Sequence, residues 1–337
     1  MLFSTAKAHD FVVTINNQKI YFAIVDDAAN TAIVTYQGSI ANFKPSEYAG
    51  ELVVPAKVKH NNKVYTIVGI GAKAFSGAQK LTGIILPNNI TEIGNFAFEG
   101  CSALEKIVFP NKQPKFGQGT FFKCDKINSI KFGDDWSRVN LVMFQWSDSL
   151  KTVNITAGIE KIEQLKKLKH LESISVDENN SKFTSINGVL YNKDCNILYG
   201  CPQAYAQPLC IPEGVTKVTT GAFIDCYKLE IVDLPKSIET ISFREFSRLE
   251  NLKEVTFRAD KPINTAKHII SGKACFLLQM ANPQAKVVTS KNAVKAYKKS
   301  LAMSAGEYSD IDQKLYVVND TELLKAKNIK GVKFKTK

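Results

Sequence analysis

Apolar residues recur along the chain with a period of 23 residues. Phe109 ends a short apolar run 23 residues after Leu86 ends a similar one. The same spacing, with one shortened unit and one 12-residue insertion, links the ends of eight such runs: Leu86, Phe109, Phe132, Ile155, Val176, Ile211, Leu234 and Phe257. A fixed period of this length predicts a solenoid, in which each repeat buries its apolar face against its neighbours.

Three further columns of residues keep register with these anchors. The column 11 positions before the anchor is large and apolar: Phe75, Phe98, Phe121, Phe144, Leu165, Phe223 and Phe246. The column 8 before is small or apolar: Ala78, Cys101, Cys124, Ser147, Leu168, Cys226 and Leu249. The column 5 before is Leu or Ile: Leu81, Leu104, Ile127, Leu150, Leu171, Leu229 and Leu252. We expect all three columns to face the interior.

Each repeat predicts one strand and one return segment. The pattern Leu-x-x-Ile-x-Leu alternates in the manner of a strand with one buried face. The preceding Ala-Phe pair indicates a turn whose ring packs between layers. The predicted fold is therefore a leucine-rich-repeat solenoid, a right-handed α/β-type superhelix that is mostly β with short helical or irregular returns.

The ends of the chain differ from its middle. Residues 1–50 predict a small β-rich N-terminal cap, with a hairpin around Asn16-Asn17 and further strands at 32–36 and 52–54. Residues 51–290 form the predicted solenoid. Within it, about residues 180–205 are predicted to be an inserted hairpin that projects from the stack. Residues 291–337 are assigned to a closing segment and a basic tail.

The repeat motif resembles that of a known family. The residues Ile-Gly-x-x-Ala-Phe-x-x-Cys-x-x-Leu-x-x-Ile-x-Leu-Pro, complete from 93 to 110 apart from Phe109 in the penultimate position and less perfect from 218 to 235, resemble the BspA-like leucine-rich repeats of bacterial surface proteins. The resemblance covers about residues 50–300. The segment 186–193 is similar to a hairpin common in the family, and 285–297 to its closing unit. Leu165, Thr156 and Asp177 depart from the motif.

The resemblance implies a location and a class of function. A member would be secreted or held on the outer cell surface, and would attach to host proteins or to other cells. The family shares no catalytic or ligand-binding residues, so none carries over to this chain. The cytoplasm remains the alternative location, because the first ten residues contain no apolar core typical of a signal peptide.

Composition adds a second class of partner. Apolar residues make up 45% of the chain and support a folded core, while 44 Lys and Arg against 32 Asp and Glu give a net charge of +12. A positive charge favours acidic partners such as glycans, nucleic acid or lipid headgroups. The Lys residues form modest clusters at 166–169, 295–299 and 325–337. Neither an aromatic platform nor a recognition-helix pattern accompanies these clusters, which favours an ordinary solvated surface.

The residues that often carry chemistry have structural interpretations here. Cys101, Cys124 and Cys226 share an inward column, which favours buried packing. Cys195, Cys201 and Cys210 lie in or beside the insertion, where a disulfide is an alternative to free thiols in an exported protein. The four His residues are dispersed, and no metal-binding, nucleophile or phosphate-loop motif is present. We therefore expect no catalytic residue, no cofactor and no metal.

The outward row of the strands is the predicted binding face. One residue before each anchor lies a row that begins apolar and becomes polar: Ile85, Val108, Lys131, Asn154, Ser175, Asp233 and Thr256. The alternative interpretation is that the cap covers Ile85 and Val108. The hypothesis is a non-enzymatic protein that binds an extracellular-matrix or cell-surface protein. An acidic glycan is the alternative partner, nucleic acid is disfavoured, and a structural spacer is the third possibility. No stretch approaches the ~20 apolar residues of a transmembrane helix.

Overall fold

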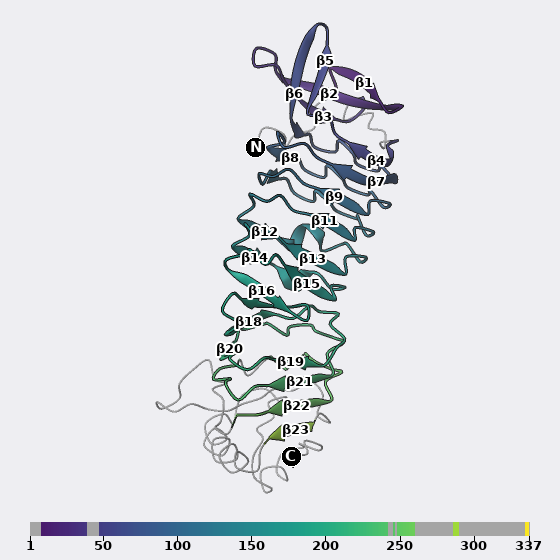
Figure 1. Ribbon diagram of the computed structural model, residues 1–337. Coiled ribbons are helices and arrows are strands. Elements are labelled where there is room, and N and C mark those ends of the chain that lie inside the picture. Colours follow the sequence, from purple (N-terminus) through teal and green to yellow (C-terminus); the bar gives the residue numbers. More distant parts are fainter. Residues whose placement is uncertain are drawn as a thin grey trace, which may run out of the picture. The chain divides into compact units, whose positions relative to one another are not determined.

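The structure is a computed structural model that describes residues 8–38, 47–241, 245–246, 248–259, 286–289 and 334–336. The chain divides into two compact units. Unit 1 contains residues 1–170 and 176–181, and unit 2 contains residues 171–175 and 182–337. Each unit is a stack of short strands joined by tight turns (Figure 1). Residues 260–285, at the end of the predicted solenoid, lie outside the described residues, as does most of the predicted closing segment and tail after residue 289.

The elements of unit 1 are short and almost entirely strands. They are β1 (Phe11–Ile15), β2 (Gln18–Asp26), β3 (Thr31–Thr35), β4 (Ala49–Val53), β5 (Lys57–His60), β6 (Lys63–Ile70), β7 (Lys80–Ile85), β8 (Glu92–Ile93), β9 (Lys106–Val108), β10 (Lys115–Phe116), β11 (Ser129–Lys131), β12 (Arg138–Asn140), the 3-10 helix η2 (Leu141–Phe144), β13 (Thr152–Ile155), β14 (Lys161–Glu163) and the 3-10 helix η3 (Leu165–Lys167).

Unit 2 consists of strands in the described residues. They are β15 (Ser173–Val176, whose last residue belongs to unit 1), β16 (Phe183–Ile186), β17 (Val189–Asn192), β18 (Ile197–Gly200), β19 (Leu209–Cys210), β20 (Lys217–Val218), β21 (Ile231–Leu234), β22 (Glu254–Phe257), β23 (Lys286–Thr289) and β24 (Phe334–Thr336). The predicted solenoid is confirmed. Its returns are turns and short 3-10 helices, so the fold is a β-solenoid rather than an α/β-type one.

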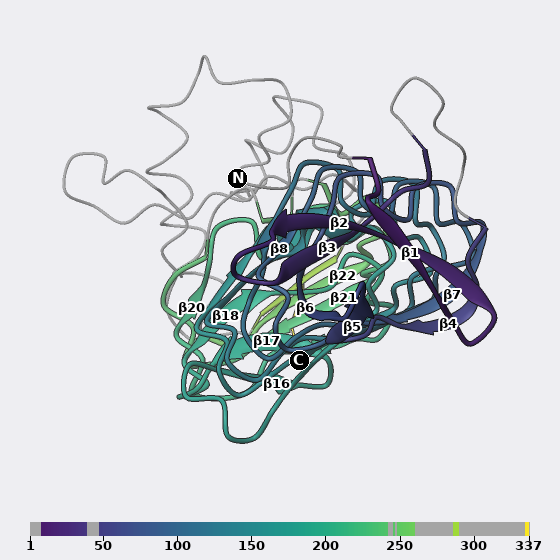
Figure 2. The same cartoon turned by 90° about the horizontal axis from the view of Figure 1, so that it is seen from above.

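An antiparallel hairpin lies at the N-terminal end of unit 1. β1 and β2 pair antiparallel around Asn16 and Asn17, which both adopt positive φ as a tight hairpin turn requires. β2 pairs with β3, and β3 continues into the solenoid by parallel pairing with β6. The hairpin lies at one end of the unit's stack (Figure 2). The Gln18 side-chain amide exchanges two hydrogen bonds of 2.9 Å with the backbone of Ala49 in β4.

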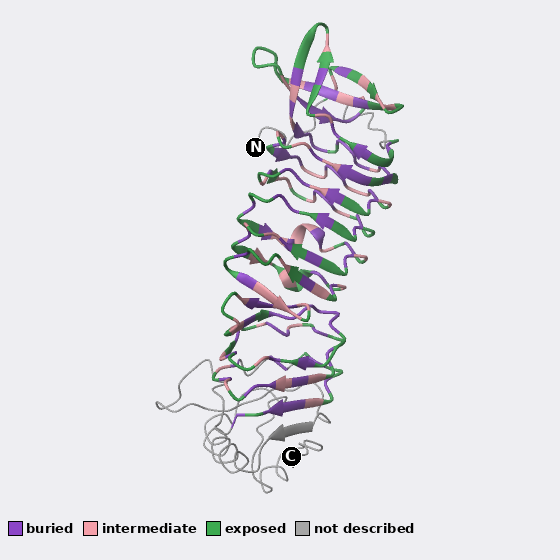
Figure 3. Cartoon of the chain, viewed as in Figure 1, coloured by how far each residue is buried: buried purple, intermediate pink, exposed green. Residues whose placement is uncertain are grey.

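The 23-residue period is visible as strand register. Ile84 pairs with Ile107 and Ile107 with Ile130, so β7, β9 and β11 of the parallel sheet β4-β7-β9-β11 follow one another at intervals of one repeat. Buried and exposed residues alternate along these strands (Figure 3). Side chains two apart therefore share a face, as the alternation predicted.

A ladder of phenylalanine rings forms the core of unit 1. Phe75, Phe98, Phe121 and Phe144 are fully buried, and successive rings stack with centroids 5.0, 5.2 and 5.4 Å apart. Stacked aromatic pairs add about 0.5–1.5 kcal/mol each beyond the apolar area that they bury. The column that the sequence predicted to pack between layers is thus a continuous stack of rings.

The cysteine column is buried in both units. The thiol of Cys101 donates to Phe75 O at 3.1 Å and that of Cys124 to Phe98 O at 2.9 Å, and both side chains are fully buried. In unit 2, Cys226 is buried in the same way. The hydrogen bond with Cys124, together with burial, raises the pKa of Cys101 well above its ordinary value. All three thiols pack in the core and donate hydrogen bonds to backbone carbonyls.

The shortened repeat departs from the column pattern. Leu165 occupies the position of the core phenylalanines but is only half-buried, and it begins η3 after Gln164, which has φ of 61°. The anchor Val176 is likewise half-buried. This repeat is two residues shorter before Leu165, so Leu165 does not reach the depth of a phenylalanine ring, whereas Leu168 and Leu171 are buried.

The insertion does not project from the stack in the way the sequence suggested. Its strands β16, β17 and β18 form an antiparallel meander, and β18 then pairs in parallel with β20 of the following repeat. Leu198 lies opposite Val218 in that pairing, and both are buried. The buried side of the hairpin needs a neighbour, and the next repeat provides it. The insertion therefore forms part of a sheet of unit 2.

A buried carboxylate replaces backbone carbonyls in unit 2. In unit 1, the N–H of Phe75 donates to the carbonyl of Ala97 in the next repeat. In unit 2, the N–H groups of Gly221 and Phe223 instead donate to the Glu245 carboxylate at 2.5 and 3.2 Å. Glu245 is 4% exposed. Burial raises its pKa, although the backbone N–H groups act in the opposite direction.

The raised pKa predicts a pH-dependent contribution to stability. A carboxyl whose pKa is higher in the folded state holds its proton more tightly there, so stability falls as the pH rises through the window between the ordinary value of 4.5 and the raised value. The advantage in melting temperature of the native protein over Glu245→Gln should therefore shrink through this window. The pKa of Glu163 is lowered by Lys161 and Arg138, so Glu163→Gln should give the opposite slope. Parallel slopes for both variants would contradict the prediction.

Candidate partner-binding face

The outward face of the sheet β4-β7-β9-β11 in unit 1 carries an apolar row. Val53 pairs with Ile85, Ile85 with Val108, and Val108 with Lys131. Val53 is 51% exposed, and Ile85 and Val108 are partly exposed. Because they share one face of paired strands, these side chains form one contiguous row that ends in a lysine. Ile85 and Val108 are each half-buried, so they are not completely covered.

A charged pair borders this row. In the neighbouring row Glu51 pairs with Gly83, and Gly83 with Lys106. The Glu51 carboxylate reaches across Gly83 to the Lys106 ammonium, with Nζ and Oε2 3.0 Å apart. A Cβ on Gly83 would lie 3.1 Å from Glu51 Cγ. The absence of a side chain at Gly83 therefore leaves room for Glu51 to reach Lys106. Both charges are about half exposed, which makes the pair a source of specificity more than of stability.

The seven predicted residues fall in different surroundings. Ile85, Val108 and Lys131 lie in register on adjacent strands of unit 1. Asn154 lies exposed on β13 of the same unit, and Ser175 lies exposed on β15 in unit 2. Val53, which extends the row, was missed because β4 precedes the first complete repeat and has no anchor from which to count.

The remaining two residues, in unit 2, are less available to a partner. Asp233 pairs with Thr256 on adjacent strands. Thr256 is only 8% exposed, and its hydroxyl donates a hydrogen bond to Glu254 Oε1. Its place in an outward binding row is therefore not supported by its burial. Asp233 is partly exposed, but its carboxylate is engaged by an arginine.

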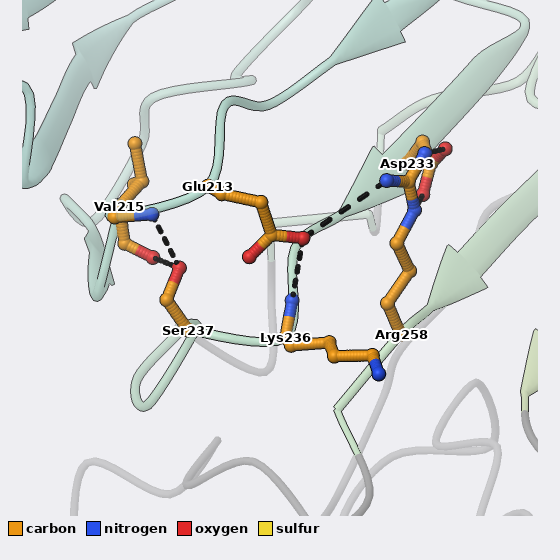
Figure 4. A network of polar contacts seen from close by, with 7 residues as sticks. Glu213, Val215, Asp233, Lys236, Ser237 and Arg258 are labelled. Carbon is orange, nitrogen blue, oxygen red and sulfur yellow. Dashed lines mark hydrogen bonds and ion pairs between the residues drawn. The ribbon is translucent and has the colours of Figure 1, made fainter.

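That arginine links successive repeats in unit 2 (Figure 4). Arg258 Nε donates to Asp233 Oδ1 at 2.8 Å, its Nη2 contacts Oδ2, and its Nη1 lies 4.0 Å from Glu213 Oε1. Glu213 also accepts from the backbone N–H of Lys236 at 3.3 Å. The bidentate pairing raises the pKa of Arg258. The guanidinium contacts both carboxylates and so connects repeats, which is a structural role.

A second exposed feature lies on the return segments of unit 1. The Trp146 ring is 49% exposed and meets the edge of Phe122, with ring centroids 5.3 Å apart and planes at 90°. Lys123 places its Nζ 5.4 Å from the centroid of Phe122. An aromatic platform beside the Lys cluster at 166–169 was not expected from the sequence, because Phe122 and Trp146 lie in different columns of successive repeats. We call this surface the aromatic corner; it comprises Phe122, Lys123, Asp125, Trp146, Asp148, Lys167 and His170.

Other chemistry is limited in the described ranges. Cys195, Cys201 and Cys210 are free thiols, so the disulfide that the sequence allowed is not formed. No group of three or more His, Cys, Asp or Glu side chains in the described parts of the chain is arranged to hold a metal ion. Among the helices of these same residues, none has the length and hydropathy needed to cross a bilayer.

Comparison with protein families gives one match. The model described as "BspA type Leucine rich repeat region" matches six copies over residues 58–166 and 196–267, which is more than half of the chain. The match omits 167–195, which contain the end of the shortened repeat and the first strands of the insertion. No curated protein sequence matches the chain significantly.

Solved structures with a similar fold share little sequence. A leucine-rich repeat protein from Bacteroides ovatus is 20% identical with a TM-score of 0.51, covering 83% of this chain and 71% of its own. The pneumococcal vaccine antigen PcpA is 18% identical with a TM-score of 0.47, covering 87% and 97%. A leucine-rich cell surface protein from Faecalibacterium prausnitzii is 17% identical with a TM-score of 0.37, covering 84% and 89%. The first of these supports the fold and nothing further.

Proposed function

Since the chain belongs to the BspA-type leucine-rich repeat family, we propose that it is a non-enzymatic binding protein of the outer cell surface. Its partner is a protein of the extracellular matrix or of another cell's surface. Leucine-rich repeat proteins commonly serve as scaffolds for protein interaction, and the family resemblance supports the location. A stacked solenoid presents a long strand face suited to this role.

One observation carries the proposal: the exposed row of Val53, Ile85 and Val108 on parallel strands. Partly exposed apolar side chains that adjoin one another, bordered by charges, are typical of the centre of a protein interface. The Glu51–Lys106 pair and Lys131 provide a polar border on the same sheet. The partner best suited to this face offers an apolar ridge with polar groups beside it.

Charge substitution on this row should weaken attachment. The double variant Ile85→Lys, Val108→Lys leaves the buried face of each strand unchanged, and so should fold. Binding to a panel of purified collagen, laminin and fibronectin, measured by biolayer interferometry, should weaken by about tenfold or more, which corresponds to about 1.4 kcal/mol.

The matched control is Val64→Lys in the β5–β6 hairpin. Val64 is also 51% exposed and lies on a strand, β6, but outside the row. It should bind as the native protein does. Equal binding by native protein, control and double variant would overturn the assignment of the face. Absence of binding to every protein of the panel would overturn the matrix as the source of the partner.

A further inference from the structure

The aromatic corner presents a single indole ring to solvent. The Trp146 ring contacts the ring of Phe122 edge-on, which restricts its orientation. The next residue, Ser147, donates a hydrogen bond of 3.1 Å from its Oγ to Cys124 O in the preceding repeat. Trp136, the other tryptophan, is fully buried and donates to Pro110 O. The exposure of Trp146 is therefore not explained by core packing, and its ring offers an apolar plane beside water.

Lysines flank this ring on successive repeats. Lys123, Trp146 and Lys167 occupy the same position, nine residues before the anchor, in three consecutive repeats. Lys123 and Lys167 are exposed, and Lys167 ends η3, which lies against η2 just before Trp146. The exposed Lys126, Lys166 and Lys169 lie on the same return segments. The charge around the ring is thus predominantly positive, which favours an anionic ligand.

Carboxylates lie among these lysines. Asp148 is 70% exposed in its side chain and lies 3.4 Å from His170 Nε2, and Asp125 precedes it by one repeat. Asp125 is also exposed. Exposed carboxylates accept hydrogen bonds from hydroxyl groups but repel a dense row of phosphates. A ligand that fits the indole ring, the carboxylates and the lysines has an apolar face, several hydroxyls and separated negative charges.

We propose that the aromatic corner binds an acidic saccharide. The C–H face of a sugar ring packs on the Trp146 indole, Asp148 and Asp125 accept from its hydroxyls, and Lys123 and Lys167 bind its carboxylate or sulfate groups. Single-stranded nucleic acid fits less well, because successive bases need successive rings and this corner exposes one. The site lies on the return segments, apart from the strand face, and so it stands independently of the proposed protein partner.

The unaltered protein provides the first test. Because Trp136 is buried, collisional quenching by acrylamide reports mainly on Trp146. Saturating chondroitin sulfate should protect the indole and shift its emission, and uncharged dextran should not. Raising the NaCl concentration from about 50 to about 300 mM should weaken binding, since the lysines are exposed and screened. Quenching that chondroitin sulfate leaves unchanged would overturn the proposal.

Variants distinguish binding at the aromatic corner from non-specific electrostatic attraction to a positively charged protein. In calorimetric titration with chondroitin sulfate, Trp146→Ala should weaken binding by about tenfold and Lys123→Glu with Lys167→Glu should abolish it. The matched control is Tyr227→Ala, since Tyr227 is 40% exposed beside Lys228 but lies in unit 2. Two results would overturn the saccharide assignment. One is native affinity of Trp146→Ala for chondroitin sulfate. The other is tighter binding of a single-stranded DNA oligonucleotide than of chondroitin sulfate, with the same dependence on Trp146.

Discussion

Replacing Phe98 with alanine is expected to destabilise the protein by about 3–5 kcal/mol, because a fully buried aromatic side chain leaves a cavity that its surroundings only partly fill. Phe98 lies between Phe75 and Phe121 in the ring ladder, with centroid distances of 5.0 and 5.2 Å. The substitution therefore removes two stacking contacts at once. Urea unfolding followed by far-ultraviolet circular dichroism measures the effect.

Phe98→Leu is the companion variant, since it keeps an apolar side chain that fills most of the space. Its expected cost is about 1–2 kcal/mol. In a repeat fold, a break in the middle of the stack can also separate unfolding into two steps. A cost below about 1 kcal/mol for Phe98→Ala would show that the neighbouring rings close the gap, and the ladder would then lack the energetic role given to it.

Gly133→Ala is expected to destabilise by about 3 kcal/mol, the upper end of the usual range for overpacking. A Cβ at this position would lie 2.1 Å from Pro110 O and 2.4 Å from Asn111 O. These are backbone atoms of the preceding repeat and have little room to move. Pro110 O also accepts the indole N–H of Trp136 at 3.1 Å, so the variant should change the emission of that buried tryptophan as well as the urea midpoint.

Gly83→Ala provides the contrast. A Cβ there would meet the side chain of Glu51, with Cγ at 3.1 Å and Oε2 at 3.3 Å. Because a glutamate side chain can rotate away, the expected cost is below about 1 kcal/mol. Similar midpoints for the two alanine variants would indicate that adjacent repeats can separate to admit a methyl group, against the close packing described for unit 1.

Periodicity predicted what depends on the repeat. Phe98 and Cys101 could be placed in the core by counting, because every repeat imposes the same environment on the same position. Leu165 shows where counting fails. Leu165 occupies the same repeat position as the core phenylalanines but is less buried than they are, since the length of the return segment sets how far a side chain reaches into the core. Thr256 likewise keeps its position in the outward column, although it is only 8% exposed.

Features that depend on an individual side chain were not predictable. Phe122 and Trp146 meet although they lie in different columns, because one ring approaches the other edge-on across two repeats. Glu245 accepts backbone N–H groups in place of a carbonyl, and no motif marks such a substitution. The pairing of β18 with β20 skips an intervening strand. Each case is decided by local packing, which a repeat pattern averages out.

The two hydrogen bonds between Gln18 and Ala49 bear on how the molecule behaves at high concentration. β4 is the last strand of its four-stranded sheet, and an uncovered terminal strand invites another chain to add to it. The Gln18 amide supplies a donor and an acceptor to Ala49, as the backbone of an added strand would. A second molecule that approaches the edge of β4 at Ala49 finds the N–H and C=O of that residue already hydrogen-bonded. One glutamine in the hairpin thus works against filament growth, the characteristic failure of proteins built from stackable repeats.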